Sequence, residues 1–157
     1  MIAQRPVRIA VCGSGTPNQE IDRLAEQVGL LLARKKAVLL CGGLFGAMEA
    51  AARGALSAGG LTVGFLPGVS PDDANDHIVL PIATGLGEAR NTVLVRSADA
   101  VIAIGGEWGT LSEIALAKKI GRPVILLNSA IAAHFDLPTA QTAEQAVQMA
   151  LAAAQAS

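Results

Sequence analysis

The sequence predicts a doubly wound, Rossmann-like α/β fold, with a sheet of about six mainly parallel strands and helices on both faces. Short apolar runs alternate strictly with segments of helical periodicity along the chain. The runs show little polar alternation, as in parallel strands covered on both faces. Aromatic residues make up only 3% of the composition, which disfavours an all-β sandwich.

Six apolar runs of about five residues each are the expected strands. In chain order they are Val7–Cys12, Ala37–Cys41, Thr62–Leu66, Ile78–Ile82, Ala100–Ile104 and Pro123–Leu127. With 157 residues the chain has the size of one domain with one core, so we expect residues 1–157 to form a single Rossmann-like domain that binds phosphate or nucleotide.

Five segments between and after these runs are the expected helices. They are Pro17–Arg34, Gly46–Ala58, Glu88–Ser97, Thr110–Ile120 and Ala143–Ala154. Thr16 and Pro17 have the residue types of an N-cap and a first helical residue, and glycines at 59–60 and 121 follow helix ends. Right-handed crossovers then place every strand-to-helix loop at one edge of the sheet.

Charge and hydropathy exclude several partners. A net charge of −1 and a pI near 6.1 give no electrostatic basis for binding a long polyanion, so no nucleic-acid partner is expected. The sequence contains neither a signal peptide nor an apolar segment of roughly 20 residues, so we expect a cytoplasmic protein with no membrane partner.

Three glycine-rich loops follow predicted strands: GSGTP at 13–17, GGLFG at 42–46 and GGEWG at 105–109. Glycine lets backbone N–H groups approach a phosphate, and the following helix N-terminus adds partial positive charge. Small residues also serve tight turns and close packing without any ligand. The sequence has neither GxxxxGK[ST] nor GxGxxG, which disfavours ordinary ATP hydrolysis and an NAD site. The candidate ligand-binding residues in these loops are Gly13, Ser14, Gly15, Gly42, Gly43, Gly105, Gly106, Glu107 and Gly109.

Thr110 and Glu113 have the spacing of a capping box at the start of the fourth helix. The same spacing fixes a carboxylate at the mouth of the third loop, where it can reach a ribose hydroxyl or position a water. Both interpretations stay open, so Thr110 and Glu113 join the candidate binding residues.

The segment GGEWGTLSEIALAKKIGRPV resembles the signature of the LONELY GUY superfamily, often mislabelled lysine decarboxylases, whose members carry Pro-Gly-Gly-x-Gly-Thr-x-x-Glu here. GGLFGAMEAAARGALSAGG and GEARN resemble two further blocks, in the right order, over roughly residues 7–127. The run LPIATGLGEARNTVLVRSADAVIAIGG is most similar to the branch that contains molybdenum cofactor carrier proteins.

The resemblance implies roles for individual residues. In the cytokinin-activating branch an Arg-Lys pair and the motif Glu hydrolyse the N-glycosidic bond of a nucleoside 5′-monophosphate, and Arg90 and Glu113 match that Arg and Glu as catalytic residues. Asn91 replaces the Lys and Glu107 replaces a Gly, which removes one positive charge and adds a negative one. Glu107 is then either a solvent-facing residue or an acceptor for a ribose or pterin.

Three functions follow, in order of preference. The first is a carrier or storage protein with the molybdenum cofactor as cargo, bound through the loops, Arg90 and Asn91. The second is a phosphoribohydrolase and the third a nucleotide sensor. Pyridoxal phosphate needs a buried Lys, whereas the four lysines form two pairs at expected helix ends, 35–36 and 118–119, so neither this cofactor nor lysine decarboxylation is expected.

Other residues carry weaker signals. Cys12 and Cys41 are expected to be buried free thiols, with contact to a soft metal centre as the alternative if a strand order 3-2-1-4-5-6 makes their strands neighbours. The acidic loop 67–77 has no zinc or calcium spacing, and no metal site is expected. Trp108 either stacks on a heterocycle or packs on side chains or a subunit. The Ala-rich segment EAAARGALSA predicts helix packing between subunits, hence a homo-oligomer, a dimer or tetramer.

Overall fold

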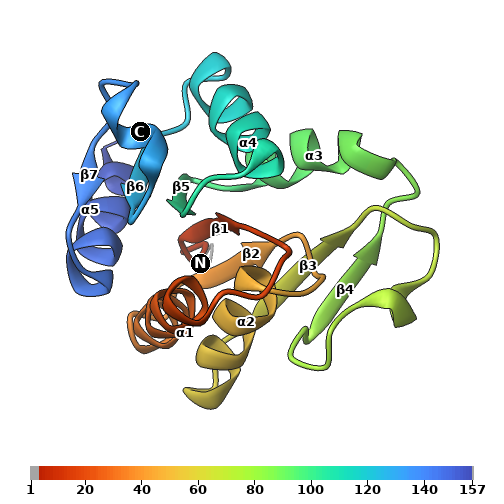
Figure 1. Ribbon diagram of the computed structural model, residues 1–157. Coiled ribbons are helices and arrows are strands. Elements are labelled where there is room, and N and C mark those ends of the chain that lie inside the picture. The colour runs from red at the N-terminus through yellow and green to blue at the C-terminus, as the bar shows by residue number, and fades with distance from the viewer. Residues whose placement is uncertain (1–3, 157) are drawn as a thin grey trace.

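A single seven-stranded parallel sheet forms the centre of the computed structural model, which describes residues 4–156 (Figure 1). The strand order is β4-β3-β2-β1-β5-β6-β7, and every neighbouring pair is parallel. The strands are β1 (Arg8–Gly13), β2 (Val38–Cys41), β3 (Thr62–Leu66), β4 (Leu80–Ala83), β5 (Ala100–Ile104), β6 (Val124–Leu127) and β7 (Thr139–Ala140). Residues 1–3 and 157 of the expected domain lie outside the described residues.

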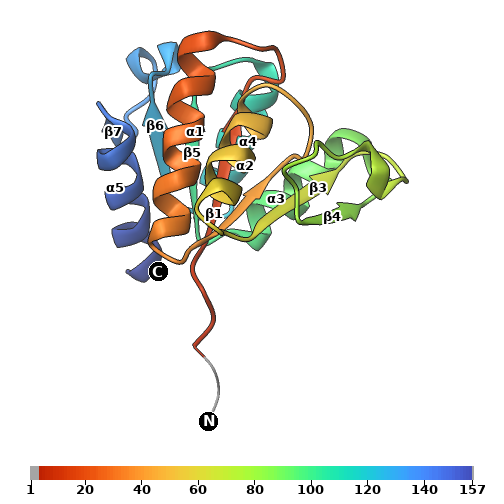
Figure 2. The ribbon, with the colours of Figure 1, turned by 90° about the horizontal axis from the view of Figure 1, so that it is seen from below.

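Helices cover both faces of the sheet, so the predicted fold class is confirmed. Helices α1 (Gln19–Arg34), α2 (Ala47–Ser57) and α5 (Ala143–Gln155) cover one face, and α3 (Arg90–Ser97) and α4 (Trp108–Lys119) cover the other (Figure 1). Figure 2 shows α5, α1 and α2 side by side in front of the strands. Within residues 4–156 no helix combines the length and the apolar character needed to span a bilayer.

Successive strand residues are buried on opposite faces. Ile9 and Val11 pack toward α1, α2 and α5, while Ala10 and Cys12 pack toward α3 and α4. Because both faces are covered, apolar residues are needed at every strand position. This is why the strands read as continuous apolar runs in the sequence.

The side on which successive strands are added to the sheet changes at β1. From β1 it moves outward through β2 and β3 to β4 at one edge, and then returns to place β5 on the other side of β1. The order 3-2-1-4-5-6 considered above is therefore wrong for the fourth strand, which pairs with β3. The expected count of six strands is also one short, because the two-residue strand β7 is too short to leave a periodic pattern.

Three helix starts differ from the sequence expectation by two residues, and the first is that of α3, which begins at Arg90 rather than Glu88. Asn18, not Thr16, caps α1, because its Oδ1 accepts a hydrogen bond of 3.1 Å from the Ile21 N–H. Helix α4 begins at Trp108, two residues before Thr110. A side chain that caps a helix is chosen by the path of the incoming loop, which residue type alone does not specify.

Helices α1 and α2 cross in close backbone contact. A methyl group at Gly29 would overlap the Ala51 carbonyl, and one at Gly54 would overlap the Glu26 carbonyl. The alanines of α2 pack into this crossing and onto the sheet. The apolar excess of EAAARGALSA is thus buried within the chain, and the sequence argument that assigned it to a subunit contact is wrong.

We expect Gly29→Ala to lower the free energy of unfolding by about 3 kcal/mol, because the added methyl group forces two packed helices apart. Urea unfolding followed by circular dichroism measures this. Gly109→Ala is the matched control, since a methyl group there meets no heavy atom of residues 4–156 within 4 Å. Equal stability of the two variants would contradict the assigned role of the crossing.

Candidate functional site

Three loops meet at the carboxyl ends of β1, β5 and β6, at the point where the order of strand addition changes sides. They line a hollow of about 300 Å³, which we call the switch-point hollow. In open parallel sheets this is the position at which ligands bind. Its lining residues include Ser14, Thr16, Asn18, Gly105, Gly106, Glu107 and Asn128.

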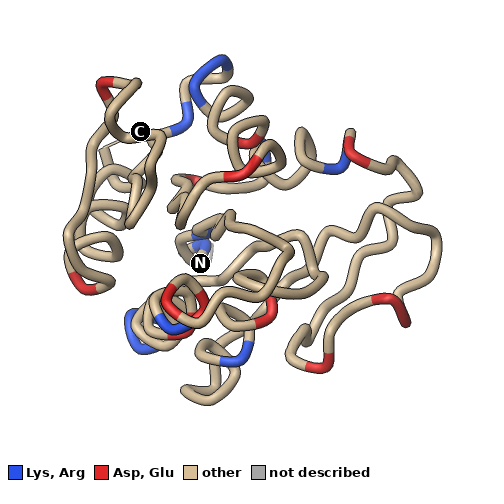
Figure 3. The backbone as a smooth tube through the Cα atoms, viewed as in Figure 1, with Lys and Arg blue, Asp and Glu red and all other residues tan. Residues whose placement is uncertain are grey.

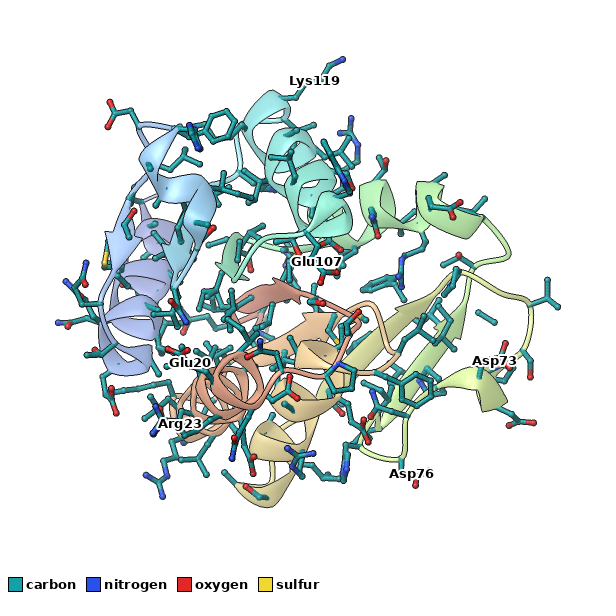
Figure 4. All side chains as sticks on the ribbon, viewed as in Figure 1. Glu20, Arg23, Asp73, Asp76, Glu107 and Lys119 are labelled. Carbon is teal, nitrogen blue, oxygen red and sulfur yellow. The ribbon has the colours of Figure 1, made fainter. Side chains whose placement is uncertain are left out.

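A second hollow of about 510 Å³ adjoins the first, and we call it the Trp108 hollow. Gly106 and Glu107 line both hollows, while Trp108, Gly109 and Ile131 line only the second. Figure 4 shows Glu107 near the middle of this edge, far from Asp73 and Asp76 beyond β3. The two hollows therefore adjoin at Gly106 and Glu107.

A further hollow, of about 610 Å³, lies between the loops that follow β2 and β3, and it does not suit a phosphate. Glu49, Asp72, Asp73 and Asp76 line it, and these carboxylates repel an anion. Among the described residues no group of three or more His, Cys, Asp or Glu side chains is placed to hold a metal ion. Charges of both signs are dispersed over the molecule rather than gathered on one face (Figure 3).

Several loop glycines have a packing role. A methyl group at Gly13 would lie 2.5 Å from the Ala47 Cβ, and one at Gly42 would lie 2.6 Å from the Met48 Sδ. Gly43 has a φ of +77° and packs on Leu66. The packing interpretation left open by the sequence therefore accounts for these three glycines.

Gly15 and Gly109 are different. From the described residues a methyl group at Gly15 would meet only the Met48 Cε, at an ordinary 3.8 Å, and one at Gly109 would meet nothing within 4 Å. Neither has a positive φ. Glycine in a helix costs about 1 kcal/mol relative to alanine, so Gly109 in the first turn of α4 leaves space that the fold itself does not require.

Backbone conformation and local contacts explain the other small residues of the loops, Gly105, Gly106 and Ser14. Gly105 has a φ of +71° and its N–H donates to the Leu127 carbonyl at 3.1 Å. A methyl group at Gly106 would crowd the Ile131 side chain at 2.8 Å. The Ser14 hydroxyl accepts from the Thr16 N–H at 2.9 Å, while the Ser14 carbonyl accepts from the Ala47 N–H.

Arg90 lies beneath the loops rather than in the switch-point hollow. One Nη donates to the carbonyl oxygens of Gly42 and Phe65, at the ends of β2 and β3. Its buried Nε has no hydrogen-bond partner among the described residues. Arg90 therefore joins the ends of β2 and β3 through one Nη atom. Its Nε–H remains available to another acceptor.

Asn91 and Thr110 are buried polar residues with unused oxygens. Asn91 is 8% exposed and donates from Nδ2 to the Ser112 Oγ at 3.3 Å; Thr110 is 2% exposed. Neither the Asn91 Oδ1 nor the Thr110 Oγ1 has a partner in the part of the chain that the structure describes. Buried polar atoms are normally hydrogen-bonded, so both are candidates for contact with a ligand or an ordered water.

Glu113 is 8% exposed and lies in the second turn of α4. Burial raises its pKa from an ordinary 4.5 to about 7, while a hydrogen bond with the Cys12 thiol and the charge of Arg90 oppose the rise. Glu113 thus holds its proton in acid and becomes a buried anion only near neutrality.

The expected capping box is wrong. Because α4 begins at Trp108, Thr110 and Glu113 lie past its N-cap, Glu107, which itself makes no side-chain capping bond within residues 4–156. The sequence also gave no sign that Cys12 partners Glu113. The spacing of residues within a strand or within a helix does not predict which residues of the two elements come into contact.

The two cysteines lie on neighbouring strands, β1 and β2, below the loops. Burial, followed by the nearby charge of Glu113, raises the pKa of the Cys12 thiol well above its usual range. Burial raises the pKa of the Cys41 thiol to about 11, and its sulfur accepts from the Gly43 N–H. Both thiols are neutral and free, so the expectation of buried free thiols is confirmed.

A parallel, doubly wound sheet with glycine-rich loops at its reversal point defines a Rossmann-like α/β protein. The chain belongs to the SLOG cluster4 family, whose model matches residues 6–156. This confirms the resemblance to the LONELY GUY superfamily.

Similar proteins match over most of their length. An uncharacterized protein from Archaeoglobus fulgidus is 45% identical over 90% of this chain and 92% of its own. The molybdenum cofactor binding protein of Rippkaea orientalis is 38% identical, with a TM-score of 0.88, over 96% of this chain and 98% of that one. The molybdenum cofactor carrier protein of Chlamydomonas reinhardtii is 32% identical, with a TM-score of 0.86, over 98% and 100%.

Glu113 should make stability depend on pH. Its carboxyl ionises near pH 4.5 in the unfolded chain and near 7 in the folded one, so unfolding between these values releases a proton. We expect the free energy of unfolding to fall by roughly 3 kcal/mol at most as pH rises from 4.5 to 7. Glu113→Gln should flatten this slope in urea titrations, and an unchanged slope would contradict the assignment.

Proposed function

We propose that the chain binds a phosphorylated small molecule at the switch-point hollow and acts as a carrier of the molybdenum cofactor. The observation that carries the proposal is Gly109, whose missing side chain leaves open space at the first turn of α4, in the Trp108 hollow that adjoins the switch-point hollow. The resemblance to proteins that bind or carry this cofactor, over nearly the full length of each chain, supports the choice of cargo.

The residues around the hollow fit an anionic group held mainly by backbone and dipoles. Helix α4 directs the partial positive charge of its N-terminus at the hollow. The Thr110 Oγ1 has no partner among residues 4–156, but Thr110 is buried and lines neither hollow, so backbone N–H groups are the main donors that we propose for a phosphate. Gly15 leaves room in the loop after β1, whose neighbouring residues Ser14 and Thr16 line the hollow. No covalent step is required of a carrier, which has to bind and release its cargo unchanged.

Phosphoribohydrolase activity is the second candidate, favoured by the proximity of Arg90 and Glu113. The charge of Arg90 acts on the Glu113 carboxyl, as expected for a pair at the two motif positions. Against this activity, Asn91 supplies no charge in place of the Lys, Glu113 is almost fully buried, and one Nη of Arg90 is occupied by main-chain carbonyls. We therefore place binding before hydrolysis.

We also propose a homo-oligomer. The alanines of α2 are buried within the chain, so the proposal rests instead on the edge strand β4. Leu80, Ile82 and Leu86 lie exposed along and beyond the edge strand β4. An unpaired strand edge with apolar side chains is a common site of association. A cytoplasmic location likewise stays a prediction.

Gly109→Ala should lower affinity for the molybdenum cofactor at least tenfold, because the methyl group fills the approach to the first turn of α4. Equilibrium dialysis with cofactor released from a purified molybdoenzyme, read out as protein-bound molybdenum, measures this. Ala115→Gly is the control, since it exchanges the same residue types at an exposed position of the same helix. Equal binding by wild type and Gly109→Ala would contradict the proposed site.

Incubation with a panel of nucleoside 5′-monophosphates, including cytokinin ribotides, should release no free base, because Asn91 leaves the site without the Lys of the hydrolase motif. Chromatography of the products measures this. Base released by wild type but not by Glu113→Gln would overturn the carrier assignment in favour of the hydrolase.

A further inference from the structure

We infer that Glu107 and Trp108 form a recognition site for the ring of the ligand, and that this site selects a 2-amino-4-oxopyrimidine edge, the edge shared by guanine and pterins. The inference rests on the proposed function, since it concerns the same ligand. It concerns the heterocyclic ring of that ligand rather than its phosphate.

Trp108 is available as a stacking platform. Its side chain is 86% exposed at the start of α4 and lines the Trp108 hollow. Leu111 and Ile131 line the same hollow and give it apolar walls. A largely exposed indole beside an apolar hollow of about 510 Å³ matches the requirement of a flat aromatic ring, which gains affinity by stacking.

Glu107 supplies the polar selection. Its carboxylate makes no capping bond with the described part of α4, although the residue occupies the N-cap position. It lies between the two hollows and lines both. An ionised carboxylate only accepts hydrogen bonds, and its two oxygens match two adjacent N–H donors on one ring edge.

Few heterocycles present such an edge. Guanine and pterins carry a ring N–H beside an exocyclic amino group, so both donors face the carboxylate. Adenine and cytosine place an acceptor beside the amino group, and uracil places its N–H between two carbonyl oxygens. A carboxylate faces an opposing lone pair in each of these cases, which is the basis for discrimination.

The chain allows a direct test, because Trp108 is its single tryptophan and it contains no tyrosine. Intrinsic fluorescence therefore reports on this position alone. We would titrate the wild-type protein with guanosine, adenosine and uridine 5′-monophosphates, and measure their affinities and that of neopterin by calorimetry.

We expect the guanosine nucleotide to bind at least tenfold more tightly than the adenosine and uridine nucleotides, which carry the same phosphate, and to quench Trp108. Glu107→Gln should abolish the preference for guanosine over adenosine monophosphate, because the glutamine amide offers one donor and one acceptor in place of two acceptors. Trp108→Leu should weaken both purine nucleotides, and Trp108→Phe should retain most of the affinity. Neopterin lacks the phosphate, so its binding measures recognition of the ring edge alone.

Equal affinities for all three nucleotides, unchanged in Glu107→Gln, would overturn the inference. So would a Trp108 emission that shifts with protein concentration in the absence of ligand, because Trp108 would then lie in a subunit contact. If wild type binds the molybdenum cofactor in either case, only this inference fails. If it does not, the proposed function fails as well.

Discussion

The parallel pairing of β5 with β1 is the contact on which the site depends. It brings the loop after β5 beside the loop after β1, although about 90 residues separate them, and it places α4 over the end of β1. The Cys12 thiol then meets the Glu113 carboxyl, and two helix N-termini lie near one hollow.

The electrostatics of the site depend more on dipoles and burial than on free cations. Arg90 uses one Nη to join the ends of β2 and β3, and Glu113 is buried against a thiol. For the proposed anionic ligand, the groups available at the switch-point hollow are backbone N–H groups and the start of α4. The two thiols and the Glu113 carboxyl are buried, and the exposed carboxylate beside the hollow is that of Glu107.

Much of the fold was predictable because buried parallel strands leave continuous apolar runs and glycines mark helix ends. Five of the six predicted runs overlap their strands closely, and the fourth, 78–82, is displaced by two residues toward β4 (Leu80–Ala83). The missed strand β7 is two residues long, too short for any periodicity. The start of α4 was misplaced because Thr110 and Glu113 have the types and spacing of a capping box, while the loop path places Glu107 at the cap.

The sequence by itself determined the fold class, the three glycine-rich loops and the family motif, because these depend on local periodicity, glycine content and short-range spacing. The tertiary structure decided what each residue does. Gly13 and Gly42 are required by neighbours distant in the sequence, whereas Gly109 faces open space. The crossing of α1 and α2 buries the alanines that the sequence assigned to a subunit. Contacts between distant segments set packing, burial and pKa, and no local pattern encodes them.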